Sequence, residues 1–88
     1  MVVKINKSVN DDLIKICEEG FPHEVCGVLI GNKKESNYFI QSSYICENLN
    51  KERASDRYEL NPRDYIKAED YAKSNNQAII GIYHSHPN

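Results

Sequence analysis

Two histidines stand one residue apart at the end of the sequence, in the stretch "AIIGIYHSHPN" that covers residues 78–88. The apolar part of this stretch predicts a strand, and alternate side chains of a strand project to the same face. His84 and His86 are therefore expected to lie side by side, with Ser85 pointing to the other face. Zinc accepts neutral imidazole nitrogens, so the pair suits a metal site. The alternative is that both histidines are exposed polar residues where a strand ends.

A carboxylate is the second unusual polar group. Glu24 stands in "FPHEVCGVLIG", directly before an apolar run that predicts a buried strand. A carboxylate beside an apolar element is costly to bury, so Glu24 is either a solvated turn residue or part of a site. His23 and Glu24 together invite comparison with the zinc motif HExxH, but Gly27 occupies the place of the second histidine. We therefore interpret His23 as an ordinary loop histidine.

The first half of the chain predicts one helix and three strands that could hold these groups. Residues 1–6 predict a short strand. A helix follows, with Ser8 as its N-cap and Gly20 at its C′ position. Further strands are predicted over residues 25–31 and 37–47. The apolar side chains expected on the inner face of the helix are Val9, Leu13, Ile16 and Cys17.

The second half predicts a loop, a second helix and the strand that leads to the histidines. Residues 48–56 are charged and lack an apolar period, which is typical of a mobile, solvated connection. Residues 57–60 predict an extended segment. A helix then begins with Asn61 as its cap and Pro62 at its first position, and its inner face would carry Tyr65, Ala68 and Ala72. Residues 78–83 predict a strand buried on both faces.

The predicted order is strand, helix, strand, strand, strand, helix, strand, which indicates an α+β or mixed α/β fold with a central mixed sheet flanked by two helices. With 88 residues the chain has room for one domain. A net charge of −2 without a basic stripe argues against nucleic-acid or membrane binding. Three widely spaced cysteines without a CxxC pair, and no signal peptide, favour reduced thiols in a cytoplasmic protein.

Taken together, "PHEVCGVLIG" and "GIYHSHPN" resemble the JAMM (MPN+) metalloprotease family, and most closely its compact prokaryotic members. The resemblance implies the layering of that fold, which is similar to that of cytidine deaminases. It implies that His84 and His86 are two of three zinc ligands and that Glu24 is the general acid/base. It further implies hydrolysis of a peptide or isopeptide bond after the C-terminal glycine of a ubiquitin-like protein, sulfur carriers included.

The sequence departs from the family pattern after the histidines. The family continues with a serine and an aspartate, whereas this sequence ends at Asn88, and Asp64 and Asp70 lie upstream in the predicted helix. We therefore expect residues 1–88 to form a single, incomplete domain that holds zinc weakly and is inactive by itself. An uncovered last strand predicts a homodimer or a swapped oligomer.

Three other interpretations have different sequence requirements. A non-catalytic scaffold of the same fold is disfavoured because Glu24 and both histidines are present, although it stays open for these 88 residues alone. A histidine-triad nucleotide hydrolase would need a third histidine at position 88, where Asn88 stands. Amidohydrolases and β-lactamase-type hydrolases also carry HxH, but in sequence contexts that are not found here.

Overall fold

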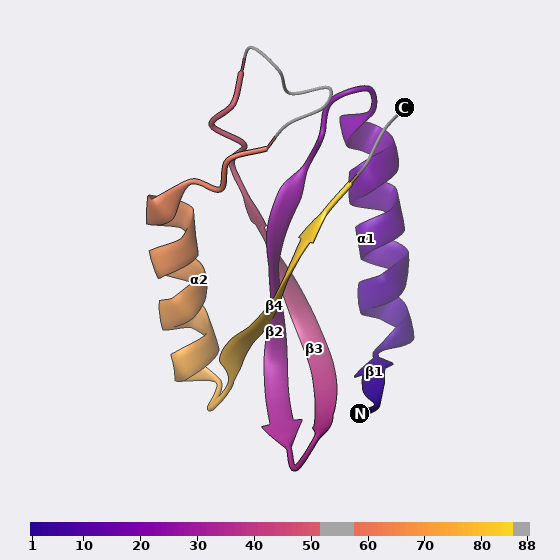
Figure 1. Cartoon of the computed structure of the whole chain (residues 1–88), viewed down its shortest axis with the longest axis vertical. Coiled ribbons are helices and arrows are strands. Elements are labelled where there is room, and N and C mark those ends of the chain that lie inside the picture. Colours follow the sequence, from indigo (N-terminus) through magenta and orange to yellow (C-terminus); the bar gives the residue numbers. More distant parts are fainter. Residues whose placement is uncertain (52–57, 86–88) are drawn as a thin grey trace.

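The computed structural model describes residues 1–51 and 58–85. Four strands form one sheet in the order β1-β3-β2-β4, in which β1 is parallel to β3 and the other pairs are antiparallel. The two helices lie on opposite sides of this sheet (Figure 1). This confirms the predicted mixed sheet flanked by two helices. The elements in chain order are β1 (Val3–Ile5), α1 (Lys7–Gly20), β2 (Cys26–Lys34), β3 (Asn37–Cys46), α2 (Pro62–Ser74) and β4 (Ala78–His84).

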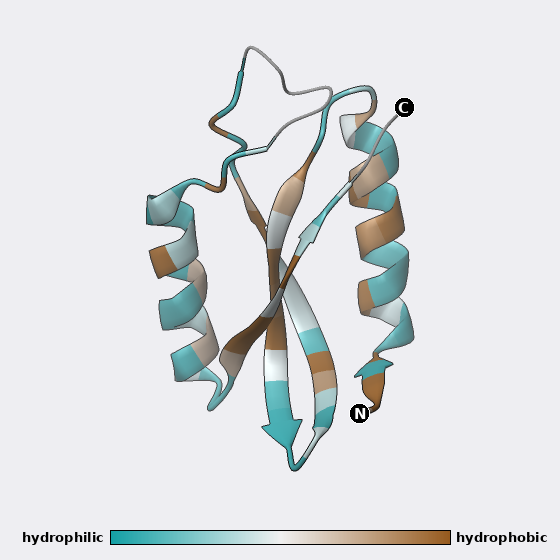
Figure 2. Ribbon diagram, in the orientation of Figure 1, coloured by the Kyte–Doolittle hydropathy of each residue, from teal (hydrophilic) through white to brown (hydrophobic). Residues whose placement is uncertain are grey.

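The core lies between α2 and the two middle strands. Val28 and Ile30 of β2 are fully buried, and they pack against Ala68 and Ala72 of α2 and against Cys46. Small alanine side chains let the helix approach the sheet closely, so the larger strand residues fill the space between them. Figure 2 shows the apolar residues concentrated along the crossing strands. The predicted inner face of the second helix is thereby confirmed, including Tyr65 at the edge of the core.

The burial on both faces predicted for the last strand is wrong. β4 lies at one edge of the sheet and, among the residues described, pairs with β2 alone. Its Ile82 side chain is 54% exposed, whereas β2 is the best-buried strand. An apolar run of this length predicts a strand but does not tell a central strand from an edge strand.

Both predicted ends of the first helix are also wrong, each by two residues. Asn6, and not Ser8, is the N-cap of α1, and its Oδ1 accepts hydrogen bonds from the Ser8 amide (2.9 Å) and hydroxyl (2.8 Å). Asparagine and serine cap equally well, so residue type alone does not favour Ser8 over Asn6. Gly20 is the last helical residue, and Phe21 is the C-cap.

The segment before α2 is simpler than predicted. Of the extended segment predicted over residues 57–60, Leu60 forms an isolated bridge with Asn48 and no further strand is present among its described residues. Asn61 caps α2 as predicted, because its side chain accepts a hydrogen bond from the Arg63 amide at 2.9 Å. Neither helix in the described ranges is long and apolar enough to cross a membrane.

Candidate functional site

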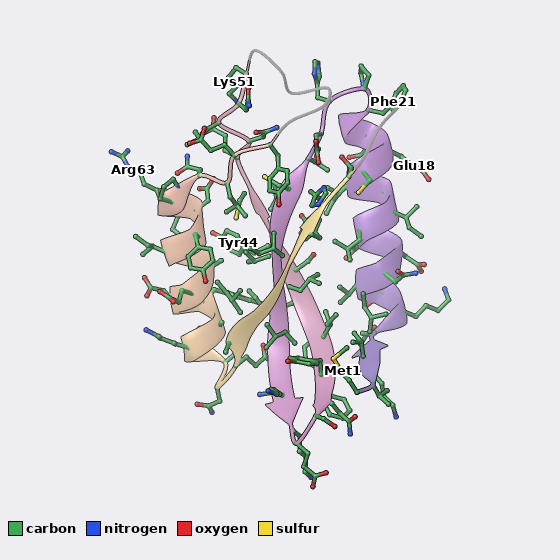
Figure 3. All side chains as sticks on the ribbon, viewed as in Figure 1. Met1, Glu18, Phe21, Tyr44, Lys51 and Arg63 are labelled. Carbon is green, nitrogen blue, oxygen red and sulfur yellow. The ribbon has the colours of Figure 1, made fainter. Side chains whose placement is uncertain are left out.

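Glu24 is the one buried charged residue within residues 1–51 and 58–85, with 3% of its surface exposed. It stands two residues before β2, and His84 is the last residue of β4. The antiparallel register pairs Cys26 with His84, so the start of β2 and the end of β4 meet at one end of the sheet. Phe21 and Lys51, labelled in Figure 3, lie at the same end of the molecule.

The Glu24 carboxylate and the His84 imidazole form a direct contact. The distance between Glu24 Oε1 and His84 Nδ1 is 2.7 Å, and the Ser85 carbonyl oxygen lies 3.2 Å from the same nitrogen. Both partners are acceptors, so we assign the ring hydrogen to Nδ1. In a neutral imidazole with this tautomer, Nε2 is the nitrogen that carries the lone pair. A histidine held by a carboxylate in this way has the arrangement common among metal-ligating histidines.

Tyr58 contacts the face of the same imidazole. The ring centroids of Tyr58 and His84 are 4.5 Å apart and the ring planes differ by 21°, which is a stacked arrangement. Tyr58 belongs to the segment between β3 and α2, whose residues 52–57 lie outside the described part. The His84 ring is therefore held at its edge by Glu24 and on its face by Tyr58.

Ser85 ties the end of β4 to the residue after Glu24. The Ser85 amide donates to the Val25 carbonyl at 2.9 Å, and the Val25 amide donates to Ser85 Oγ at 2.8 Å. In a regular antiparallel pair the second bond would go to the main-chain carbonyl of residue 85. Here the hydroxyl takes its place. The strand can then leave the sheet at Ser85 without leaving the Val25 amide unpaired.

Asn48 connects three segments around the site, and sequence reasoning missed it. Its Nδ2 donates to the Glu24 carbonyl at 3.0 Å, and its Oδ1 accepts from the amides of Asn50 (3.0 Å) and Glu59 (2.8 Å). The prediction that residue 48 begins a solvated connection is confirmed for the exposed Leu49 and Lys51, whereas Asn48 itself is half-buried. The contact with Asn50 is an Asx-turn, a pattern that an Asn-x-Asn sequence can indicate. The bond to Glu24 has no signal in the sequence.

Cys26 stands opposite His84 in the register, but it does not suit nucleophilic catalysis. It is fully buried, and its thiol lies 3.7 Å from the Cys46 carbonyl oxygen, to which it donates. Burial raises the pKa of the Cys26 thiol, and the nearby Glu24 charge raises it further. A reactive cysteine needs a lowered pKa. The chemistry at this end of the sheet therefore rests on the carboxylate and the imidazole.

The described residues supply part of the predicted zinc site. Glu24 and His84 are brought together, as expected, whereas His86 lies outside the described residues. Within the ranges described, no three side chains of His, Cys, Asp or Glu gather in a way that could hold a metal ion. His84 fits a zinc ligand by the chemistry of its donor and its carboxylate partner. A complete ligand set requires residues beyond those described.

Comparison with known proteins identifies the family. The family of prokaryotic homologues of the JAB domain matches residues 6–88. The chain belongs to this JAMM/MPN family. A desampylase of Pyrococcus furiosus is a JAMM/MPN relative, 33% identical over 63 residues, which cover 72% of this chain and 41% of the relative.

A solved structure supports the same fold. The solution structure of a Desulfitobacterium hafniense protein is similar with a TM-score of 0.87 and 23% identity, over 99% of this chain and 57% of that one. The fold assigned to the JAMM/MPN chain from its strands and helices thus agrees with an independently solved neighbour. The chain spans less than two thirds of either protein.

Proposed function

We propose that this chain is part of a zinc-dependent hydrolase of the JAMM type, a metallopeptidase or isopeptidase. Its substrate would be a ubiquitin-like protein, sulfur carriers included, cleaved after the C-terminal glycine in the cytoplasm. The observation that carries the proposal is the buried Glu24 carboxylate, 2.7 Å from His84, in a chain of this family. The match to a desampylase supports the substrate class.

In this proposal His84 and His86 hold the zinc ion, and a third ligand comes from residues beyond those described. Bound zinc lowers the pKa of a coordinated water and polarises the substrate carbonyl. The share of the relatives that is covered, 41% and 57%, supports the view that residues 1–88 are part of a larger domain. By themselves these residues would hold zinc weakly.

Glu24 acts in this proposal as the general acid/base. A carboxylate at this position can take a proton from an attacking water and return it to the leaving amine. Burial keeps it in a fixed place, and the contact from Oε1 to His84 sets its orientation. The carboxylate has a second oxygen with which to exchange protons. Proton transfer by a positioned group contributes about 10²- to 10⁴-fold to a rate.

The test compares three variants of the protein that contains these 88 residues. The assay follows cleavage of a ubiquitin-like protein fused after its C-terminal Gly-Gly to a reporter, and zinc content is measured in parallel. Glu24→Gln keeps an oxygen that can accept the His84 hydrogen bond but cannot exchange a proton. We expect it to retain zinc and to lose about 10²-fold or more in rate. His84→Ala should lose zinc.

The matched control is His23→Ala, which removes an exposed histidine beside Glu24 and should leave cleavage and zinc content unchanged. Cleavage by Glu24→Gln at the wild-type rate would contradict the acid/base role. Full zinc content in His84→Ala would contradict the ligand role. A protein that binds a ubiquitin-like partner without zinc and without cleavage would instead be a non-catalytic scaffold of this fold.

A further inference from the structure

The peptide unit between Glu24 and Val25 is held by side chains at both of its polar ends. Its carbonyl oxygen accepts from Asn48 Nδ2 at 3.0 Å, and its amide donates to Ser85 Oγ at 2.8 Å. The carbonyl and the amide of a trans peptide point in opposite directions, so two such bonds fix the rotation of the plane between them. Because the Glu24 Cα lies in this plane, the two bonds also hold the atom from which the Glu24 side chain extends.

The two side chains that hold this peptide, Asn48 and Ser85, are also connected to the His84 ring through neighbouring residues. Ser85 directly follows His84 in the chain. The carboxamide of Asn48 accepts from the Glu59 amide at 2.8 Å, and Glu59 directly follows Tyr58, whose ring stacks on His84. The groups that hold the imidazole at its edge and on its face, Glu24 and Tyr58, are therefore both held through Asn48.

The orientation of the Asn48 carboxamide is determined by its partners. Among the contacts with described residues, Nδ2 donates to a carbonyl oxygen and Oδ1 accepts from two amide N–H groups, so an exchanged amide would lose these three bonds. The side chain is half-buried, in a place where competition from water is reduced. We propose that Asn48 is a positioning residue that orients the Glu24 carboxylate and the Tyr58 ring against His84. That this arrangement serves hydrolysis rests on the proposed function.

Two substitutions separate the two roles of the carboxamide. Asn48→Asp has the same shape and can still accept from the Glu59 amide, but it has no N–H for the Glu24 carbonyl. Asn48→Ala loses both contacts. The matched control is Asn32→Asp, because Asn32 Nδ2 also donates to a main-chain carbonyl of a distant segment, that of Asn76, at 3.1 Å. The control removes the same type of bond at a different place.

The readout is nuclear magnetic resonance of the 88-residue chain without zinc or substrate, so that it does not depend on the proposed function. A hydrogen between Nδ1 and a carboxylate gives a downfield ring signal, and the stacked rings give cross-relaxation between Tyr58 and His84. In Asn48→Asp we expect loss of the Nδ1 signal, and in Asn48→Ala loss of both signatures. Asn32→Asp should keep both. A merely structural asparagine would leave them in place in any variant that folds.

Retention of both signatures in a folded Asn48→Ala variant would overturn the proposal. If neither Asn48 variant folds, the wild-type chain decides. The Asn48 side-chain amide should then exchange slowly with solvent and show contacts to the Glu24 α-hydrogen. Rapid exchange at the rate of an exposed asparagine would overturn the proposal as well.

Discussion

Removal of the Ser85 hydroxyl should loosen the end of β4 where it carries His84. Ser85→Ala keeps the bond from its own amide to the Val25 carbonyl at 2.9 Å but removes the acceptor of the Val25 amide at 2.8 Å. An unsatisfied buried donor costs about 1–3 kcal/mol. This pair is only partly buried, so water can replace part of the lost bond, and we expect about 1 kcal/mol. That corresponds to about a fivefold change in an equilibrium constant.

Two measurements separate a local loss of stability at the end of β4 from a loss of stability of the whole fold. Urea unfolding of the 88-residue chain gives the change in the free energy of unfolding, and hydrogen exchange at the Val25 amide reports opening at the site itself. Ser85→Ala should lower the free energy of unfolding by about 1 kcal/mol and speed hydrogen exchange at the Val25 amide about fivefold. Ser85→Thr keeps a hydroxyl and should restore both. Wild-type exchange at Val25 in a Ser85→Ala chain would refute the idea that the hydroxyl replaces a main-chain acceptor.

Coupling between Ser85 and Asn48 provides an internal check on the same reasoning. The two side chains bind the two ends of one peptide unit, so the loss of either should weaken the hold of the other. Residues of one hydrogen-bond network show coupling of about 0.5–3 kcal/mol in double-mutant cycles. Additive effects of Ser85→Ala and Asn48→Ala would show that the peptide is held by other contacts.

Three further predictions concern the sheet. Gly27→Ala should lower the free energy of unfolding by about 3 kcal/mol, because a Cβ there would lie 2.4 Å from the Tyr44 carbonyl oxygen and 2.5 Å from the Tyr83 ring. The control in urea unfolding is Gly81→Ala, whose added Cβ would meet a flexible Leu29 methyl at 3.3 Å as its nearest contact. Equal effects of the two substitutions would contradict the packing described for Gly27. Burial, with a smaller effect of the Asp64 charge, raises the pKa of Cys46 from 9.0 to about 11. The contribution of the protonated thiol to the free energy of unfolding is therefore complete below pH 9.0 and should be lost as the pH rises towards 11. At pH 8 a thiol reagent should label Cys17 alone, and labelling of Cys46 at the same rate would contradict its burial. The 88-residue chain should self-associate through the outer edge of β4, measured by light scattering at increasing concentration, and Ile82→Lys should reduce this; a monomer at all concentrations would refute the expectation.

Apolar periodicity and the capping residues predicted the elements and the inner face of α2 well, but not the burial of β4. Asn61 and Pro62 fixed the start of α2, and the alanines of its inner face lie in the core. The strand before the histidines was recognised, yet its exposure was not, because an apolar run carries no information about which strands and helices cover it. That information comes from tertiary contacts, which place β2 between β3 and β4.

The residues of the candidate site could be predicted where a polar side chain stands beside an apolar strand and also matches a family motif. Glu24 beside an apolar strand and His84 at the end of another are such residues, and the structure places them in contact. The role of Asn48 was not predictable, because it depends on a main-chain carbonyl 24 residues away and on an amide 11 residues further along the same connection. Tyr58 was missed for the same reason, since a ring contact between a loop residue and the end of a distant strand has no signal in the sequence.

The residue between the two histidines has a physical role at the end of β4. A strand places residues 84 and 86 on one face only if residue 85 keeps its place in the ladder. β4 ends at His84, and the Ser85 carbonyl oxygen lies 3.2 Å from His84 Nδ1 instead of accepting from the Val25 amide. A side-chain hydroxyl solves this, because Ser85 Oγ accepts in its stead. With alanine or valine at this position, either the Val25 amide beside Glu24 would lose its acceptor, or the main-chain carbonyl of residue 85 would have to accept from it and extend the ladder. Either change would move His84 relative to Glu24.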